Sequence, residues 1–205
     1  MPRMIGYGED ALTLWALQHR IGDILREFRD NTAPEDCLVY YRPSFGRSGG
    51  EGNAEFGEFD AIVASRMKFY LIESKWDNGT KLDRETLTLR KEQILRHDIF
   101  EWYLNNWGSK YSDNWQAFVD EEGKNFRFSK KMAPAGSLLA RNLEAILSSL
   151  LNHCTVDTLV NNVENVLLFF YDANNSKPLA QANIGFKVIN VEYGKVFPNR
   201  FVNLF

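Results

Sequence analysis

The segment 57–76, GEFDAIVASRMKFYLIESKW, constrains the fold of this chain more than any other. Its apolar side chains form two runs of strand length, 58–65 and 68–76, with a Ser-Arg pair near the turn between them. Runs of this length and composition are typical of central β-strands joined by a tight turn. We therefore expect a hairpin that is buried within a sheet.

Charged side chains interrupt this hairpin. Because side chains alternate between the two faces of a strand, Glu73 and Lys75 share one face, and Glu58 and Asp60 also share a face. A buried charge is costly unless it is paired or binds a metal. One interpretation is a salt bridge between Glu73 and Lys75 at a strand end, with Asp60 as a surface acid. The apolar strands around these residues favour a catalytic site instead.

Asp60 and the triplet 73–75, ESK, resemble the signature of the PD-(D/E)XK nuclease superfamily, which includes restriction endonucleases and archaeal Holliday-junction resolvases. That signature is an Asp on one strand and a Glu-x-Lys at the end of the next. The quartet 57–60, GEFD, is similar to the Gly-Glu-Ile-Asp of many members, with Phe59 where the superfamily name has Pro. The resemblance covers residues 5–105 and implies a metal-dependent nuclease.

Phosphodiester hydrolysis suits the residue types in this motif. Cleavage needs a nucleophilic water and stabilisation of charge on the phosphate and the leaving oxygen, and Mg²⁺ held by oxygen ligands supplies both. The resemblance implies that Asp60, Glu73 and the backbone carbonyl of Ser74 bind Mg²⁺, with Mn²⁺ as a substitute. It also implies that Lys75 contacts the attacked phosphate and the water. Two nearby acids keep this lysine charged unless burial outweighs them.

The first helix offers a further acid. Residues 8–29 predict a helix, because apolar side chains recur in them at helical spacing. Many members of the superfamily carry a glutamate on the first helix that reaches the metal, and Glu9 matches that placement. The alternative is that Glu9 only stabilises the helix N-terminus, where the helix dipole favours anions. Glu58 is interpreted as a structural acid, with metal binding as its alternative.

A second helix is predicted over residues 83–106, with Asp83 as its N-cap. Gln93 and His97 are four residues apart and share one stripe of this helix, with Lys91 close by. Several branches of the superfamily place a glutamine here that points back to the site, so the resemblance makes Gln93 a candidate catalytic residue. A solvated helix face is an equal alternative for Gln93 and the preferred interpretation for Lys91 and His97.

The remaining segments complete an α/β pattern with a mixed central β-sheet flanked by helices. We expect a strand at 37–41, an insert at about 107–135 with a short helix near 113–121, a helix at 136–152, an internal strand at 165–171 and an edge strand at 184–193. The order α-β-β-β-α-β with C-terminal additions is that of the restriction-endonuclease-like core. The crossover before 165–171 predicts a parallel, right-handed strand pair inside an otherwise antiparallel sheet.

Composition narrows the class of protein. With 205 residues, 44% of them hydrophobic, the chain suits one nuclease-like domain with its core at 5–105 and 136–193. The net charge of −3 argues against a general nucleic-acid coat but leaves room for local basic patches. Cys37 and Cys154 have no metal spacing and indicate free intracellular thiols. No signal peptide or membrane-spanning run is found, so we expect a cytoplasmic protein without membrane contact.

Two groups of basic residues are candidates for contacting DNA. Residues 124–131, KNFRFSKK, interleave basic and aromatic side chains, which can contact phosphates and stack on bases. A solvated hairpin is an equal alternative for this stretch. Arg47, in a glycine-rich loop, could form a positive rim around the acidic centre together with Arg84, Arg90 and Arg96.

The sequence thus predicts a Mg²⁺-dependent endodeoxyribonuclease of the restriction or repair type. We expect a homodimer on DNA, because cutting both strands commonly takes two sites. One alternative is a nucleic-acid-binding or regulatory protein on the same fold, without catalysis. Another is an unrelated α+β protein with a chance motif, in which Glu73 and Lys75 do not converge with Asp60 in space.

Overall fold

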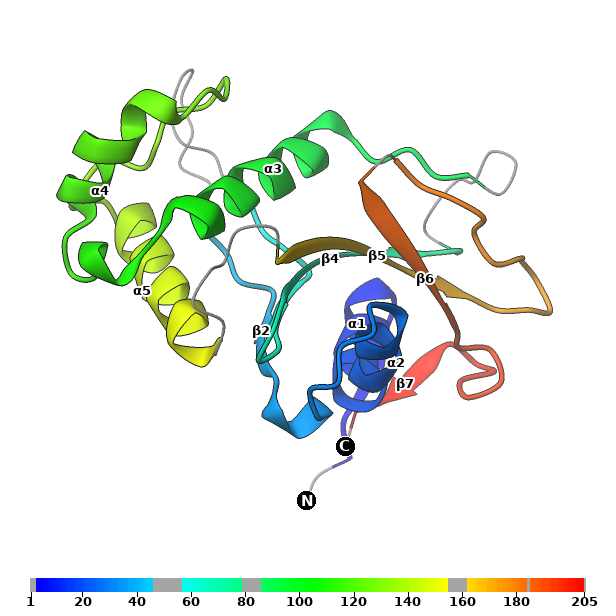
Figure 1. The fold of residues 1–205 in the computed structure, drawn as a ribbon. Coiled ribbons are helices and arrows are strands. Elements are labelled where there is room, and N and C mark those ends of the chain that lie inside the picture. Colours follow the sequence, from blue (N-terminus) through cyan, green and yellow to red (C-terminus); the bar gives the residue numbers. More distant parts are fainter. Residues whose placement is uncertain (1–2, 46–56, 79–85, 155–161, 184, 205) are drawn as a thin grey trace.

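The chain folds around a five-stranded sheet with helices on both faces (Figure 1). The computed structural model describes residues 3–45, 57–78, 86–154, 162–183 and 185–204. The elements in these residues are β1 (Ile5–Tyr7), α1 (Glu9–His19), α2 (Ile21–Glu27), β2 (Leu38–Tyr41), β3 (Ala61–Ala64), β4 (Phe69–Trp76), α3 (Lys91–Asn106), α4 (Trp115–Glu122), α5 (Leu138–His153), β5 (Val163–Tyr171), β6 (Phe186–Glu192) and β7 (Phe201–Asn203).

The central sheet has the strand order β2-β3-β4-β5-β6. β3 runs antiparallel to both β2 and β4, whereas β5 is parallel to β4 and β6 is parallel to β5. The expected parallel pair between β4 and β5 and the expected edge strand β6 are therefore confirmed. The expectation of an otherwise antiparallel sheet is wrong. The chain leaves β5 at Tyr171 and enters β6 at Phe186, which is long enough for the return crossing that a parallel neighbour needs.

Each face of the sheet packs against its own helices, because strand side chains alternate between the two faces. α1 and α2 cover the face that carries Val63, Tyr70 and Ile72. α3, α4 and α5 cover the opposite face, which carries Ile62 and Leu71. Figure 1 shows α1 and α2 below the sheet and α3 above it. Any polar residue that continues the alternation of Ile62 or Leu71 therefore lies on the side of α3.

The first helix is broken where the sequence predicted a continuous one over residues 8–29. Arg20 separates α1 from α2, since it leaves the helical conformation with φ −129° and ψ 9°. Its guanidinium bonds to Asp23 in the first turn of α2. Leu12 on α1 and Ile24 on α2 are both buried in the same core. Two short helices thus replace the predicted continuous helix.

The helix that follows the hairpin begins later than predicted. α3 starts at Lys91, whereas Asp83, the expected N-cap, lies outside the described residues. Thr86 instead forms a parallel bridge to the segment between β5 and β6. Leu87 is buried there against β5. Extended backbone satisfies hydrogen bonds and buries apolar area at this point, so the tertiary structure overrides the local preference for helix.

The insert and the chain ends show two further features. α4 confirms the short helix of the insert, and a 3₁₀ turn at Gly123–Asn125 and a loop follow it. β1 and β7, which the sequence did not reveal, pair antiparallel and place Ile5 opposite Asn203. The N- and C-terminal segments therefore lie side by side next to α1 (Figure 1).

Two expectations from composition can be compared with the structure. Cys37 and Cys154 are both free thiols, as expected. Burial raises the pKa of the Cys37 thiol to about 11, so this thiol stays protonated at neutral pH. Among the helices of the described segments, none is long and apolar enough to cross a membrane.

Candidate active site

A cavity of about 620 Å³ opens beside the C-terminal half of β4. Asp60, Glu73 and Lys75 all line it, so the expectation of the chance-motif alternative that these residues do not converge in space is wrong. Glu9 and Gln93, which the resemblance implied for the same site, line it too. The lining consists of polar and charged residues around one glycine: Glu9, Asp10, Arg42, Gly57, Glu58, Asp60, Glu73, Lys75, Arg90, Gln93 and Arg96.

The sequence had predicted that Asp60 lies on the first strand of the hairpin. In the structure it lies directly before β3. The register pairs Ala61 with Ile72, so Asp60 is opposite Glu73, one position further along the hairpin. The backbone N–H of Ser74 donates to Asp60 Oδ2 at 2.7 Å. Burial and the negative charge of Glu73 raise the pKa of Asp60 from 3.8 to about 7. Asp60 is therefore about half protonated at neutral pH, because its charged form is disfavoured in the cavity.

Glu73 is the most enclosed acid of the cavity, with 2% of its surface exposed. Its Oε1 accepts from Lys75 Nζ at 2.8 Å and from Gln93 Nε2. Its Oε2 accepts from Arg96 Nη2 at 2.7 Å. Two cations and an amide thus compensate a buried carboxylate that would otherwise be very costly.

The ammonium group of Lys75 lies between two acids of the cavity, Glu73 and Glu9. Besides Glu73, its Nζ donates to the backbone carbonyl of Ser74 and lies 3.6 Å from Glu9 Oε1. Burial opposes its charge, but the charges of Glu73 and Glu9 outweigh burial and raise the pKa of Lys75 above its usual value. Lys75 is therefore a positive charge at neutral pH and has no tendency to act as a proton acceptor.

Glu9 reaches the cavity from the first turn of α1. Its Oε2 accepts the backbone N–H of Trp76 at 3.0 Å, at the end of β4. Burial raises the pKa of Glu9, the charge of Lys75 lowers it, and Glu73 adds repulsion, with a net rise. Gly8 precedes the helix with φ +87°, a conformation that favours glycine. The carboxylate of Glu9 thus faces β4 and the other acids, in addition to the favourable position of this acid at the helix N-terminus.

On α3, the structure separates three residues that the sequence had grouped. Gln93 points into the cavity and donates to Glu73, while its Oε1 accepts the N–H of Arg90 at 3.0 Å and so caps the helix. Lys91 is exposed, as preferred. The preferred interpretation of His97, as part of a solvated helix face, is wrong. This residue is fully buried, its Nδ1 is 2.7 Å from Asn165 Oδ1, and burial lowers its pKa to about 4.

Two arginines have roles that the sequence did not reveal. Arg96 was predicted only as part of a positive rim, but it bonds directly to Glu73. Its spacing of three from Gln93 could have indicated this position, because residues three apart are neighbours on a helix. Arg42 was not singled out at all. It bonds to both Asp10 and Glu58, across the mouth of the cavity. This pairing agrees with the interpretation of Glu58 as a structural acid.

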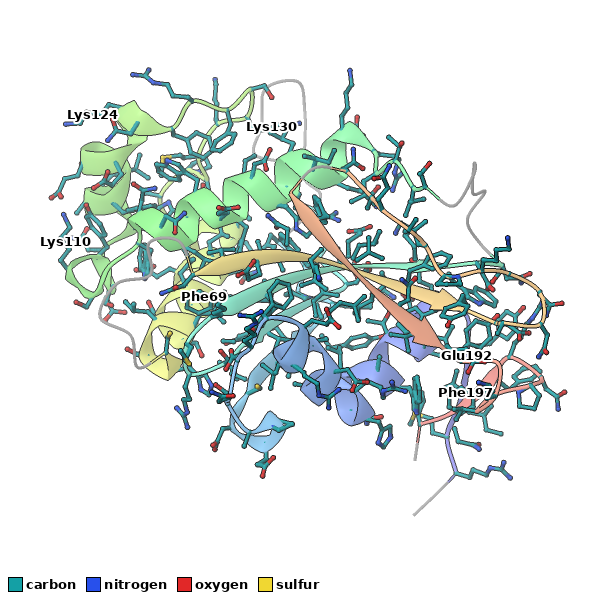
Figure 2. The ribbon with its side chains drawn as sticks, turned by 45° about the vertical axis from the view of Figure 1, so that its right-hand side comes forward. Phe69, Lys110, Lys124, Lys130, Glu192 and Phe197 are labelled. Carbon is teal, nitrogen blue, oxygen red and sulfur yellow. The ribbon has the colours of Figure 1, made fainter. Side chains whose placement is uncertain are left out.

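No residue of the basic segment 124–131 lines the cavity. Its aromatic residues Phe126 and Phe128 pack against the core of the α3 side, and Phe126 contacts Trp102 near the far end of α3. Figure 2 shows Lys124 at the end of the molecule where β4 begins, whereas the cavity adjoins its C-terminal half. These two aromatic side chains are therefore partly buried against the core, and a contact of this segment with DNA stays a prediction.

Of the four arginines predicted for the rim, Arg90 and Arg96 line the cavity. The glycine-rich loop with Arg47, and Arg84 after β4, lie outside the described residues.

The donor chemistry of the cavity fits a magnesium ion. Glu9, Asp60 and Glu73 repel one another in the cavity. A divalent cation relieves such repulsion, and carboxylate oxygens are the ligands that Mg²⁺ prefers. As arranged in the described segments, no three His, Cys, Asp or Glu side chains form a ready metal-binding group. Lys75, Gln93 and Arg96 already donate to the Glu73 carboxylate, so a metal ion bound there would compete with these partners.

No protein-family model, no curated protein and no solved structure matches this chain.

Proposed function

We propose that this protein is a Mg²⁺-dependent endonuclease with a restriction-endonuclease-like core, which hydrolyses phosphodiester bonds of DNA. One observation carries the proposal: two neighbouring strands bring Asp60, Glu73 and Lys75 to the same cavity. α1 adds Glu9 and α3 adds Gln93, as the resemblance implies for such a site. The mixed sheet and the order of its elements agree with that core.

The motif residues and Glu9 each have a definite part in this proposal. Asp60, Glu73 and the carbonyl of Ser74 would hold the metal, with Glu9 as a further ligand. The bound ion would supply a nucleophilic water and neutralise charge on the phosphate. Lys75 keeps its proton next to Glu73 and Glu9, so its part is to orient the phosphate and the water.

The supporting residues position this machinery. Gln93 fixes the Glu73 carboxylate while its own oxygen caps α3, so the helix and the strand hold each other in place. Arg42 joins Asp10 to Glu58 and so ties the start of α1 to the segment before β3. Because a duplex is commonly cut in both strands by two sites, we propose that a homodimer is the active form.

A second function has its own supporting observation. Both oxygens of Glu73 are occupied by protein donors. A carboxylate that is fully paired within the protein suits a nucleic-acid-binding or regulatory protein on the same fold, without catalysis. The two functions differ in whether Asp60 and Glu73 bind a metal.

Cleavage of supercoiled plasmid by the purified protein tests the first function. The reactions contain Mg²⁺, Mn²⁺ or EDTA and compare the wild type with Glu73→Gln, which keeps the shape of the side chain. Glu92→Gln is the matched control, since Glu92 is exposed in the first turn of α3 and is not part of the cavity. Metal-dependent cutting should be lost only in Glu73→Gln.

Two results would count against the endonuclease. Equal cutting by the wild type and Glu73→Gln would assign the activity to a contaminant. DNA binding without cutting, and without metal binding that depends on Asp60, would support the non-catalytic alternative.

A further inference from the structure

The side chain of Arg96 contacts both β4 and the segment directly before β3. Its Nη2 donates to Glu73 Oε2 at 2.7 Å, and its guanidinium carbon lies 5.1 Å from the ring centroid of Phe59. At Gly57 a Cβ atom would lie only 3.2 Å from Arg96 Nη1, so glycine leaves room for the guanidinium. The buried Nε of Arg96 has no hydrogen-bond partner in the described part of the chain.

This geometry leaves Arg96 with unused N–H donors at the cavity where a phosphate group of DNA would bind. A guanidinium has five N–H donors in a planar fork that matches the oxygens of a phosphate. Glu73 holds Arg96 by one nitrogen, and the buried Nε is unpaired. A metal ion on Glu73 would repel the guanidinium, because both carry positive charge and both need the same carboxylate.

We infer that Arg96 exchanges partners: it is bonded to Glu73 in the metal-free protein, and to a phosphate oxygen of the substrate once a metal ion has taken its place. The inference rests on the proposed function and makes Arg96 both a competitor of the metal and a phosphate-binding residue.

The first test measures metal binding without DNA. Mn²⁺ is titrated calorimetrically into the wild type, Arg96→Gln, Arg90→Gln and Asp60→Asn near pH 8. Both arginine variants remove one positive charge from the cavity, but Arg90 contacts Gln93 rather than Glu73. Because a charge-assisted hydrogen bond to a metal ligand is lost, we expect Arg96→Gln to bind Mn²⁺ about tenfold more tightly. Arg90→Gln should stay within about twofold of the wild type, since exposed charges interact weakly.

A purely structural role of Arg96 predicts the opposite result. If Arg96 only positions Glu73, its loss should weaken Mn²⁺ binding. Arg96→Lys covers the case in which Arg96→Gln does not fold, because lysine keeps the charge beside Glu73 but lacks the planar fork. This variant should bind Mn²⁺ like the wild type and bind DNA more weakly.

The second test measures the contact with phosphate. All proteins carry Lys75→Met to prevent cutting, and the anisotropy of a labelled duplex of about 20 bp is followed in Mn²⁺ and in EDTA. Arg96→Gln should weaken binding about tenfold in Mn²⁺ and less than about twofold in EDTA. The slope of log K against log salt should fall by about 0.9 in Mn²⁺, as expected for one lost phosphate contact.

The outcomes separate this inference from the proposed function. Mn²⁺ binding that Asp60→Asn abolishes, but that Arg96→Gln does not tighten, overturns the exchange alone. The absence of an Arg96-dependent difference between Mn²⁺ and EDTA overturns the contact with phosphate. If the wild type binds no Mn²⁺, the proposed function and this inference are both wrong.

Discussion

Replacing Asp60 by asparagine should stabilise the metal-free protein, although it destroys the proposed site. Burial and the charge of Glu73 raise the pKa of Asp60 from 3.8 to about 7, and the N–H of Ser74 and the charge of Lys75 offset only part of this effect. Asparagine has nearly the same shape and carries no charge. Its Oδ1 can still accept the N–H of Ser74, which Asp60 accepts now at 2.7 Å.

The sign of the effect follows from proton binding. Below about pH 4 the Asp60 carboxyl is protonated in both the folded and the unfolded chain. Between about pH 4 and 7 the folded protein binds more protons, so its free energy of unfolding falls as the pH rises. Each pKa unit corresponds to about 1.4 kcal/mol, which sets an upper limit of about 4 kcal/mol above pH 7. Because Glu73 shares this repulsion, we expect a gain of about 1–3 kcal/mol for Asp60→Asn.

Urea denaturation in EDTA, near pH 8 and near pH 4, measures this gain. Asp36→Asn is the control, because Asp36 is an exposed acid in the short turn before β2. The advantage of Asp60→Asn over the wild type should be present near pH 8 and nearly vanish near pH 4. Equal stability of the two proteins near pH 8 would show that the cavity does not disfavour the charged form of the Asp60 carboxylate.

Added Mn²⁺ should reverse the order of stability. A ligand that binds only the folded protein stabilises it by about 2.7 kcal/mol at one hundred times its Kd. Only the protein with Asp60 should gain this stabilisation. A similar gain in Asp60→Asn would place the metal elsewhere.

Three further predictions address the site and the core. Lys75→Met should reduce cleavage by more than about 100-fold without loss of the folded state by circular dichroism, and an active variant would exclude the proposed part of Lys75. Leu71→Ala should lower the free energy of unfolding by about 2–5 kcal/mol, because Leu71 is buried between the sheet and α3. Leu138→Ala is the control, since Leu138 is exposed. His97 is buried with its pKa lowered to about 4, so stability is lost as the pH falls from about 6.5 to 4. In the wild type this contribution opposes that of Asp60 over the same pH range, so His97→Phe should make the free energy of unfolding fall more steeply as the pH rises from about 4 to 6.5, and an unchanged slope would argue against a neutral, buried imidazole.

Much of the candidate site could be predicted from the sequence, because it depends on a local property of β-strands. Alternation along β4 places Glu73 and Lys75 on the face that carries Leu71, and the short hairpin places Asp60 opposite Glu73. The parallel pairing of β4 with β5 could be predicted for a similar reason, since an intervening helical crossover brings the next strand back in the same direction.

Only the tertiary structure decided how the charges of the cavity are paired. Arg96 and Gln93 meet Glu73 because α3 packs on that face of the sheet. Arg42 reaches Asp10 across 32 positions of sequence. The late start of α3 also depends on a contact with a distant part of the chain. Periodicity reports which face a side chain occupies, because backbone geometry is local. It does not report which charged partner lies within hydrogen-bonding distance, because that partner is brought there by the packing of the whole fold.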